Sequence, residues 1–382
     1  MKLSPEWRRG RARVRSLIRH RSSLPDGSEA ASYTRTTSVE RPCSTAKKAR
    51  TCGHERAMGL PELLETGQQL DHFRIDEPIA ESGMAAIYRA TDMRDGRKVA
   101  LKIPHFAMEA DPALFDRFQR EEAIGLALDH PNVMRIYPVD DRSRVYMAME
   151  WVDGKLLRQV MAEEGKMPAA RAIGITRGIL KALDYIHKNG VVHRDLKPEN
   201  IMVGANDSLK LIDFGIASQA GAKRLTYAGF SQALGSPDYI SPEQVKGKRG
   251  DARSDLYAVG VMLYEMLSGK TPFSGPSPLA VMNDRLINHL LPPREAEPSI
   301  SPQLQEVLYR ALEREPKNRY PSAHSFAQDL EHLDQVGVAE RMELTNWKKR
   351  RSNKMRQFLY YGGLALIPFV LFLAMVLLAR HR

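Results

Sequence analysis

Residues 193–200, His-Arg-Asp-Leu-Lys-Pro-Glu-Asn, bring three different functional groups into one short segment. Asp195 supplies a carboxylate, Lys197 an ammonium group and Asn200 a carboxamide. Transfer of a phosphoryl group needs a carboxylate that orients the acceptor hydroxyl, a cation that offsets developing charge, and oxygen ligands for magnesium. Thirteen residues after Asn200 begins Asp-Phe-Gly at 213–215, which adds a further carboxylate suited to a metal ion. The spacing therefore predicts phosphoryl transfer from a nucleotide.

The elements that must position these groups change in type along the chain. Strand-like patterns broken by turns run through residues 73–102, and a further strand is expected at 145–151. Helical periodicity is expected at 113–128 and dominates beyond residue 155. The clearest helical stretches in this second part are 169–188, 255–268 and 301–313. The pattern predicts an α+β protein in which a small β-rich lobe precedes a larger helical lobe.

The net charge of +11 is concentrated at the two ends of the chain. Residues 1–57 hold fourteen Lys and Arg against five acidic residues, and residues 346–382 hold eight with no acidic residue. The part between them carries a net charge of about −6, so no nucleic-acid partner is expected. Residues 1–57 also lack sustained apolar periodicity, and we expect them to be a disordered basic segment that residues 58–72 connect to the folded part.

Residues 358–379 form a run of twenty-two uncharged, mostly apolar residues. A helix of this length spans the roughly 30 Å core of a bilayer, so the run is predicted to be a transmembrane helix. The preceding linker at 336–357 holds six Lys and Arg between positions 348 and 356, and only two such residues follow the run. The positive-inside rule then places the upstream part in the cytoplasm. Because about three residues follow the run, we expect a tail anchor with no external sensor domain.

From residue 73 to about 335 the motifs resemble those of the eukaryotic-type serine/threonine protein kinases found in bacteria. The segment Leu-Lys-Pro-Glu-Asn at 196–200 is similar to the serine/threonine branch rather than the tyrosine branch. The resemblance implies a bilobal kinase domain at 73–335, with an N-lobe at 73–152 and a C-lobe at 153–335. It also implies ATP and magnesium as cofactors, and proteins with serine or threonine acceptors as partners.

The resemblance assigns a role to each group that carries the chemistry. Asp195 would orient the acceptor hydroxyl or accept its proton. Lys197 would neutralise charge on the transferred γ-phosphate. Asn200 and Asp213 would hold magnesium through oxygen atoms.

In the N-lobe, Val-Ala-Leu-Lys at 99–102 resembles the strand that contributes a lysine to the ATP phosphates. The resemblance implies that Ala100 lines the nucleotide site and that Lys102 pairs with a carboxylate on a helix. Of two adjacent candidates we prefer Glu121, which stands nine residues before the His-Pro-Asn segment that begins at position 130, as in the family. Glu122 is interpreted as its solvated neighbour.

The loop expected to cover the phosphates departs from the family pattern, which is G-x-G-x-x-G followed by valine. Alanine or serine occupies all three glycine positions, which are Ala80, Ser82 and Ala85. The other residues of this loop that we expect beside the nucleotide are Ile79, Gly83 and Ile87. Glycine is favoured there because backbone N–H groups must approach phosphate closely. Alanine and serine are the least obstructive replacements, so we expect weakened rather than abolished ATP binding.

Residues 149–153, Met-Glu-Trp-Val-Asp, resemble the hinge between the two lobes. The resemblance implies that Met149 is the gatekeeper and that Glu150 and Val152 offer backbone hydrogen bonds to adenine. Asp153 would reach the ribose. The alternative for these residues is an ordinary strand end.

Three further residues are interpreted as structural. Glu243, in Ser-Pro-Glu at 241–243, would pair with Arg319. Asp255 would brace the catalytic loop, residues 193–200, from a helix. The family uses these positions to hold the domain together rather than for chemistry.

The stretch between Asp213 and Glu243, residues 214–242, corresponds to the activation segment of the family. Because Arg194 precedes the predicted catalytic aspartate, the resemblance implies a kinase switched by phosphorylation of this stretch. Thr226 and Ser231 are the preferred phosphate acceptors, and Ser236 is expected to contact the catalytic loop instead.

The preferred hypothesis is an active, membrane-tethered protein serine/threonine kinase that uses Mg-ATP and also phosphorylates itself. The alternative is a pseudokinase scaffold that binds partners at the membrane, and the degenerate glycine loop favours it. A small-molecule kinase is a third hypothesis, weakened by the Ser-Pro-Glu segment. The sequence makes no prediction of the oligomeric state.

Overall fold

The computed structural model describes residues 63–82, 84–106, 111–213, 218–219 and 237–339. The predicted basic segment at 1–57 and the predicted transmembrane helix at 358–379 lie outside these ranges, as do Gly83, Thr226 and Ser231. Within the described ranges, no helix combines the length and the apolar character that crossing a membrane requires.

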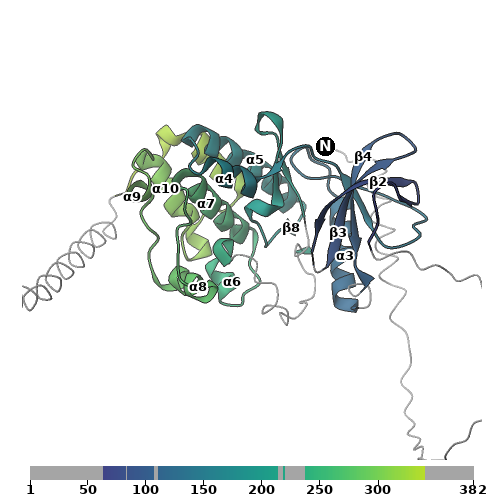
Figure 1. Ribbon diagram of the computed structural model, residues 1–382. Coiled ribbons are helices and arrows are strands. Elements are labelled where there is room, and N and C mark those ends of the chain that lie inside the picture. The colour runs from purple at the N-terminus through teal and green to yellow at the C-terminus, as the bar shows by residue number, and fades with distance from the viewer. Residues whose placement is uncertain (1–62, 83, 107–110, 214–217, 220–236, 340–382) are drawn as a thin grey trace, which may run out of the picture. The chain divides into compact units, whose positions relative to one another are not determined.

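The described part of the N-lobe is a six-stranded antiparallel sheet with a helix packed on it (Figure 1). The strands follow the spatial order β1-β2-β3-β4-β6-β5. The elements are β1 Gln69–Leu70, β2 Phe73–Glu81, β3 Ala85–Asp92, β4 Lys98–Pro104, α3 Pro112–Leu126, β5 Ile136–Tyr137 and β6 Met147–Glu150. Successive residues of β4 belong to different apolar cores, because side chains of a strand alternate between the two faces of a sheet. The core that contains Ala100 also contains Phe118 of α3, which holds this helix against the sheet.

The C-lobe is helical and is built around α7 (Figure 1). Its helices are α4 Leu157–Glu164, α5 Ala169–Lys188, α6 Pro242–Val245, α7 Ala252–Ser268, α8 Pro278–Ile287, α9 Pro293–Ala296, α10 Pro302–Ala311 and α11 Ala323–Glu331. The carboxylate of Asp251 caps the start of α7 by accepting the N–H of Arg253 at 2.9 Å. Gly269 ends the helix with a φ of +71°, a conformation that glycine adopts without steric cost. Almost every residue between these caps is buried.

Short strands and turns of the C-lobe flank residues 193–200 and Asp213. They are β7 Lys155–Leu156, β8 Val191–Val192, β9 Ile201–Val203, β10 Leu209–Leu211, β11 Ser218–Gln219 and the 3-10 turns η1 Pro198–Asn200 and η3 Pro237–Tyr239. Residues 193–200 connect β8 to β9, and Asp213 follows β10. Antiparallel pairing of β11 with β8 returns the chain to the strand that precedes the catalytic loop.

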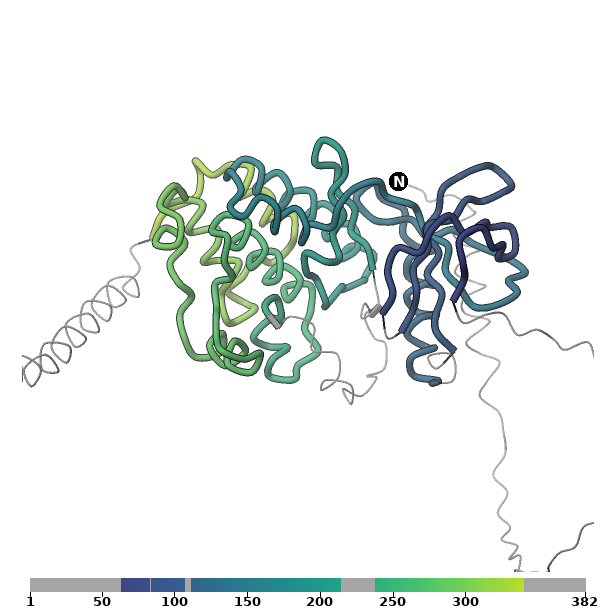
Figure 2. Tube along the Cα trace, viewed as in Figure 1, coloured from purple at the N-terminus to yellow at the C-terminus, as the bar shows by residue number. Residues whose placement is uncertain are grey.

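The predicted elements agree closely with the observed ones. The helix predicted at 169–188 is α5, and the strands predicted at 73–102 are β2, β3 and β4. The helix predicted at 113–128 begins one residue earlier and ends two residues earlier, as α3. Figure 2 shows the two lobes in chain order, with the purple and blue residues in the sheet and the green and yellow residues among the helices. The expectation of a β-rich lobe followed by a helical lobe is confirmed.

Candidate active site

The catalytic loop brings together the three groups that its sequence suggested. Lys197 Nζ donates to Asp195 Oδ2 at 2.9 Å, and Asn200 Nδ2 donates to the backbone oxygen of Asp195 at 2.7 Å. Pro198 begins the turn η1 that places Asn200 back over the loop, because its fixed φ suits the first position of a helical turn. Since Nδ2 of Asn200 is engaged, Oδ1 is the atom that this residue can offer to a cation.

A buried carboxylate on α7 holds the backbone of this loop. Asp255 is fully buried and accepts the N–H of His193 at 3.0 Å and the N–H of Arg194 at 2.8 Å. Its Oδ2 also lies 2.8 Å from Nε2 of His187. Burial raises the pKa of Asp255, but the hydrogen bonds outweigh burial and hold the pKa below its ordinary value. The predicted brace is thus a charged side chain bonded to the loop.

The brace compensates for backbone strain next to the reactive carboxylate. Arg194 has a φ of +68°, which costs a non-glycine residue about 1–3 kcal/mol. Arg194 has two further bonds besides the one to Asp255. Its backbone oxygen accepts a hydrogen bond from Nε2 of Gln244 at 2.9 Å, and its Nε donates to the backbone oxygen of Gly250 at 3.3 Å. Contacts from α6 and α7 therefore determine how the loop presents Asp195.

Asp213, the first residue of the Asp-Phe-Gly motif, follows a residue that is bonded to the catalytic loop. The N–H of Ile212 donates to the backbone oxygen of Asn200 at 2.9 Å. Asp213 follows with a φ of +66°, and its Oδ1 lies 3.7 Å from Lys102 Nζ of the N-lobe. The oxygen atoms of Asn200 and Asp213 form a donor set that suits magnesium, which prefers oxygen ligands and retains several waters.

Lys102 on β4 contacts Glu121 on α3, the carboxylate preferred from the sequence. Its Nζ donates to Oε1 of Glu121 at 2.6 Å, and only 6% of the Glu121 side chain is exposed. Burial lowers the pKa of Lys102, but Glu121 and Asp213 outweigh burial and raise it above its ordinary value, so the ammonium is charged. The sequence interpretation of Glu122 as solvated was wrong, because Arg142 Nη1 donates to its Oε1 at 2.6 Å.

The degenerate loop between β2 and β3 is organised by a serine hydroxyl. Ser82 Oγ accepts the N–H of Ala85 at 3.1 Å and that of Met84 at 3.3 Å, and donates to the oxygen of Ala85 at 3.0 Å. His105, just after β4, donates from Nε2 to the backbone oxygen of Ser82 at 2.9 Å. Ala80 pairs with Ile87 within the hairpin. Backbone donors that could approach a phosphate are thus directed to Ser82.

Sequence reasoning did not find these loop contacts. A serine in a tight turn that bonds nearby backbone groups is a recognised pattern, so the local sequence held a signal for Ser82. His105 gave none, because its partner lies 23 residues away.

The hinge residues lie at the end of β6. Met149 is buried and pairs with Ala100 of β4, so both line the same core. Glu150 Oε2 accepts Lys210 Nζ at 2.8 Å, which joins the hinge to β10. The carboxylate of Asp153, predicted to reach a ribose, accepts the indole N–H of Trp151 at 2.7 Å. Val152 follows on the same stretch and is partly buried.

Glu243 on α6 forms a bidentate ion pair with Arg319. Arg319 Nη1 donates to Oε1 at 2.8 Å and Nη2 donates to Oε2 at 2.6 Å. The Arg319 side chain is fully buried, and Ser254 Oγ also donates to Oε1 at 2.6 Å. Burial raises the pKa of Glu243, but the bonds from Arg319 and Ser254 outweigh burial and leave the pKa below its ordinary value.

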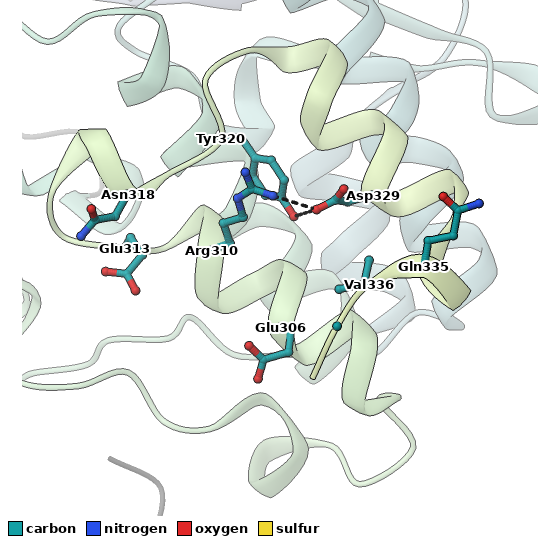
Figure 3. Close-up of a pocket in the computed structure, with 9 residues that line it drawn as sticks. Glu306, Arg310, Glu313, Asn318, Tyr320, Asp329, Gln335 and Val336 are labelled. Carbon is teal, nitrogen blue, oxygen red and sulfur yellow. Dashed lines mark hydrogen bonds and ion pairs between the residues drawn. The ribbon is translucent and has the colours of Figure 1, made fainter. Parts of the chain in front are cut away.

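A cavity of about 410 Å³ lies apart from these motifs, among α10, α11 and the residues that follow α11 (Figure 3). Arg310 crosses it to Asp329, with Nη1 3.2 Å from Oδ2, and stacks on the ring of Tyr320 at 4.4 Å. Tyr320 donates to the same Asp329 oxygen at 2.8 Å. These polar groups satisfy one another, and none of the residues that line the cavity belongs to the catalytic loop.

The bilobal fold, the lysine–glutamate pair and the braced acidic loop together define a protein kinase domain. Residues 73–331 match the family described as the protein kinase domain, and the chain belongs to that family.

Curated relatives are named as serine/threonine-protein kinases. The chain is 38% identical over 264 residues to a probable serine/threonine-protein kinase of Streptomyces coelicolor, covering 68% of this chain and 39% of the relative. It is 37% identical over 265 residues to the serine/threonine-protein kinase PknB of Mycobacterium leprae, covering 68% and 42%. The chain spans only about two fifths of the length of these relatives.

A solved structure is also similar. The kinase domain of Mycobacterium tuberculosis PknI matches with a TM-score of 0.55 and 26% identity. The match covers 71% of this chain and 99% of the PknI domain.

Proposed function

We propose that this protein transfers the γ-phosphate of ATP to serine and threonine side chains of proteins, and that it does so at the cytoplasmic face of a membrane. The observation that supports catalysis is the Lys102–Glu121 pair at 2.6 Å with Asp213 beside it. In the family this pair and the aspartate must both be in place for phosphoryl transfer.

Each group in the site then has a chemical task. Magnesium, when bound, offsets the charge of the phosphates, and Asn200 and Asp213 are the residues that would hold it. Lys102 grips phosphate oxygens with its ammonium group. Asp195 orients the acceptor hydroxyl and receives its proton at the carboxylate, while Lys197 keeps a positive charge beside it.

The test of this function uses the full chain in detergent with Mg-ATP and a generic basic protein. We expect phosphoserine or phosphothreonine on the acceptor, detected by mass spectrometry, and none with the Asp213→Asn variant. Phosphate on Thr226 or Ser231 in the same reaction would support autophosphorylation of the activation segment. ATP binding without any transfer would contradict the proposal and favour a pseudokinase scaffold.

The membrane proposal is supported by the apolar run at 358–379 and the basic residues before it. Deleting residues 358–379 is expected to move the protein from the membrane pellet to the soluble fraction, because the hydrophobic segment would be gone. Fractionation followed by immunoblotting measures this. Deletion of residues 1–57 serves as the control and should leave the protein in the pellet. Unchanged pelleting without 358–379 would refute the anchor.

Activity is expected to fall as the pH drops through about 7. Burial raises the pKa of Glu121 from 4.5 to about 7, against the lowering effect of Lys102. Below this pH the carboxyl group becomes neutral and the ion pair is lost, whereas above it both partners are charged. The value of kcat/KM for ATP, which reports groups of the free enzyme, should decrease about tenfold per pH unit on the acid side.

Two variants identify the group responsible for this decrease in kcat/KM at low pH, which we call the acid limb of the pH profile. Glu121→Gln should lower activity about 10- to 100-fold, the loss expected for a charged hydrogen bond, and should remove the limb. Glu122→Gln is the matched control, since that residue pairs with Arg142 instead, and it should keep the limb. An identical acid limb in Glu121→Gln would show that another group titrates.

Replacing Ser82 is expected to strengthen ATP binding. Ser82→Ala releases the N–H groups of Met84 and Ala85 from the hydroxyl, and Ser82→Gly also removes the Cβ atom. Released donors can bind phosphate, so the Kd for Mg-ATP should fall by about threefold to tenfold in calorimetry. Tighter binding in Ser82→Gly alone would implicate the Cβ atom instead of the hydroxyl. No change in either variant would contradict the assignment.

A further inference from the structure

Arg285 is a charged side chain with no solvent exposure, on the helix α8. The helix begins after Ser277, whose hydroxyl accepts the N–H of Ala280 at 3.2 Å. Removing a guanidinium group from water costs several kcal/mol unless its N–H groups find partners. A fully buried arginine therefore indicates a specific set of contacts.

The terminal nitrogens of Arg285 bond to the backbone that precedes α6. Nη1 donates to the oxygen of Ile240 at 2.6 Å, and Nη2 donates to the oxygen of Asp238. The guanidinium group also lies 5.5 Å from the ring centre of Phe273 and 5.9 Å from that of Tyr257. The planar fork of arginine holds two carbonyl groups at a fixed separation in this way, whereas the compact ammonium of lysine lacks that fixed geometry.

The residue between these two carbonyl groups is tied to the catalytic loop. Tyr239 shares hydrogen bonds with Glu265 of α7 and Arg158 of α4. Arg158 in turn donates from Nε to Oε1 of Glu199 at 2.9 Å and from Nη1 to Glu265 at 3.0 Å. Glu199 stands between Lys197 and Asn200 in the catalytic loop.

The segment 238–240 is therefore held from two sides. Its backbone is bonded to Arg285 on one side, and its tyrosine side chain reaches the catalytic loop through Arg158 on the other. Figure 1 shows α8 beside α6, which continues from this segment, and Gln244 of α6 bonds to the oxygen of Arg194 at 2.9 Å. Residues 238–240 are therefore linked, through Tyr239, Arg158 and Glu199, to the loop that carries Asp195, the residue assigned to the acceptor hydroxyl.

We propose that Arg285 is a positioning residue that fixes the backbone of 238–240 against the catalytic loop and thereby sets the affinity for the protein acceptor. The contacts of Arg285 described above involve neither Lys102 and Glu121 nor Asn200, so ATP affinity is not expected to depend on it. The proposal rests on the proposed function, because it concerns the acceptor of the same reaction.

The test compares three variants of the full chain. Arg285→Gln removes the charged fork, and Arg285→Lys keeps the charge but not the fork. Arg314→Gln is the matched control, because Arg314 donates to the oxygen of Ile287 at 2.9 Å and so holds the other end of α8. The measurements are the KM values for the acceptor protein and for ATP, kcat, and amide hydrogen exchange over residues 238–246.

In Arg285→Gln we expect the KM for the acceptor to rise about tenfold or more, as the loss of charge-assisted hydrogen bonds implies. The KM for ATP should change less than about twofold, and exchange over 238–246 should become faster. Arg285→Lys should recover part of the acceptor affinity. Arg314→Gln should leave the acceptor KM and the exchange of this segment as in the original protein.

The other possible results also support or refute the positioning role of Arg285. An unchanged acceptor KM with unchanged exchange in Arg285→Gln would overturn it, and so would equal losses for acceptor and ATP. If Arg285→Gln does not fold, Arg285→Lys decides: an acceptor KM equal to that of the original protein refutes the positioning role. If the original protein transfers no phosphate, the proposed function fails, and faster exchange in Arg285→Gln but not in Arg314→Gln still supports Arg285 as the anchor.

Discussion

Replacing Asp195 with asparagine is expected to lower kcat for phosphate transfer by about 10³-fold, within the range known for the loss of a general base. The amide has nearly the same shape, so Lys197 can still donate to its oxygen, as it does to Oδ2 at 2.9 Å. It cannot receive the proton of an acceptor hydroxyl. The loop backbone is held by Asp255 independently of this side chain, so the site should remain folded.

Steady-state kinetics with a protein acceptor, combined with calorimetric titration of Mg-ATP, measures this effect. The Kd for Mg-ATP should change less than about twofold, because Asp195 is assigned to the acceptor and not to the phosphates. Asp184→Asn is the matched control: it makes the same chemical change on α5, where Asp184 pairs with an exposed lysine, Lys188. Transfer by Asp195→Asn within tenfold of the original rate would exclude this carboxylate as the base.

Replacing Arg319 with alanine is expected to lower the free energy of unfolding by about 3–5 kcal/mol, the cost of leaving a buried charge without its partner. Glu243 would lose two hydrogen bonds of 2.8 and 2.6 Å and keep the one from Ser254. The oxygens of Glu313, Arg253 and Arg314 would lose their donor as well. A loss of this size is a large fraction of the 5–15 kcal/mol that stabilises most domains.

Urea denaturation of the chain that lacks residues 358–379 measures the loss. Arg253→Ala is the control, since its ion pair with Asp251 is partly exposed and should contribute less than about 1 kcal/mol. Replacing Glu243 and Arg319 together with Leu and Met should cost less than Arg319→Ala alone, because no unpaired charge remains. Equal losses in the double and single variants would show that the bonds to the carbonyl groups, rather than the charge of Glu243, explain the effect.

The local patterns predicted the elements well, because they depend on neighbours in the sequence. The apolar periodicity of 169–188 has the repeat of a helix, and α5 occupies those residues. The alternation in β3 and β4 likewise reflects the two faces of a sheet. Where a prediction failed, the partner was distant along the chain: Glu122 bonds to Arg142, which is 20 residues away and follows α3.

Spacing inside a motif also predicted contacts within the site. Glu121 was preferred over Glu122 because it stands nine residues before the His-Pro-Asn segment, as in the family, and Glu121 is the residue that Lys102 contacts. The pairing of Asp255 with the catalytic loop and of Glu243 with Arg319 followed from the family resemblance, and the structure contains both. The loop at 79–87 looked merely degenerate, although its turn is bonded through Ser82 and His105.

The sequence by itself determined the identity and spacing of the groups that can perform phosphoryl transfer, because these groups lie close together in short motifs. It also predicted an apolar anchor at 358–379, which depends only on length and hydrophobicity. The tertiary structure alone decided which charged side chains meet where no motif had suggested the pair. Arg285 and Arg158 hold residues 238–240 and the catalytic loop together from α8 and α4. Buried ions must find partners wherever the packed chain brings them, and sequence separation carries no record of that choice.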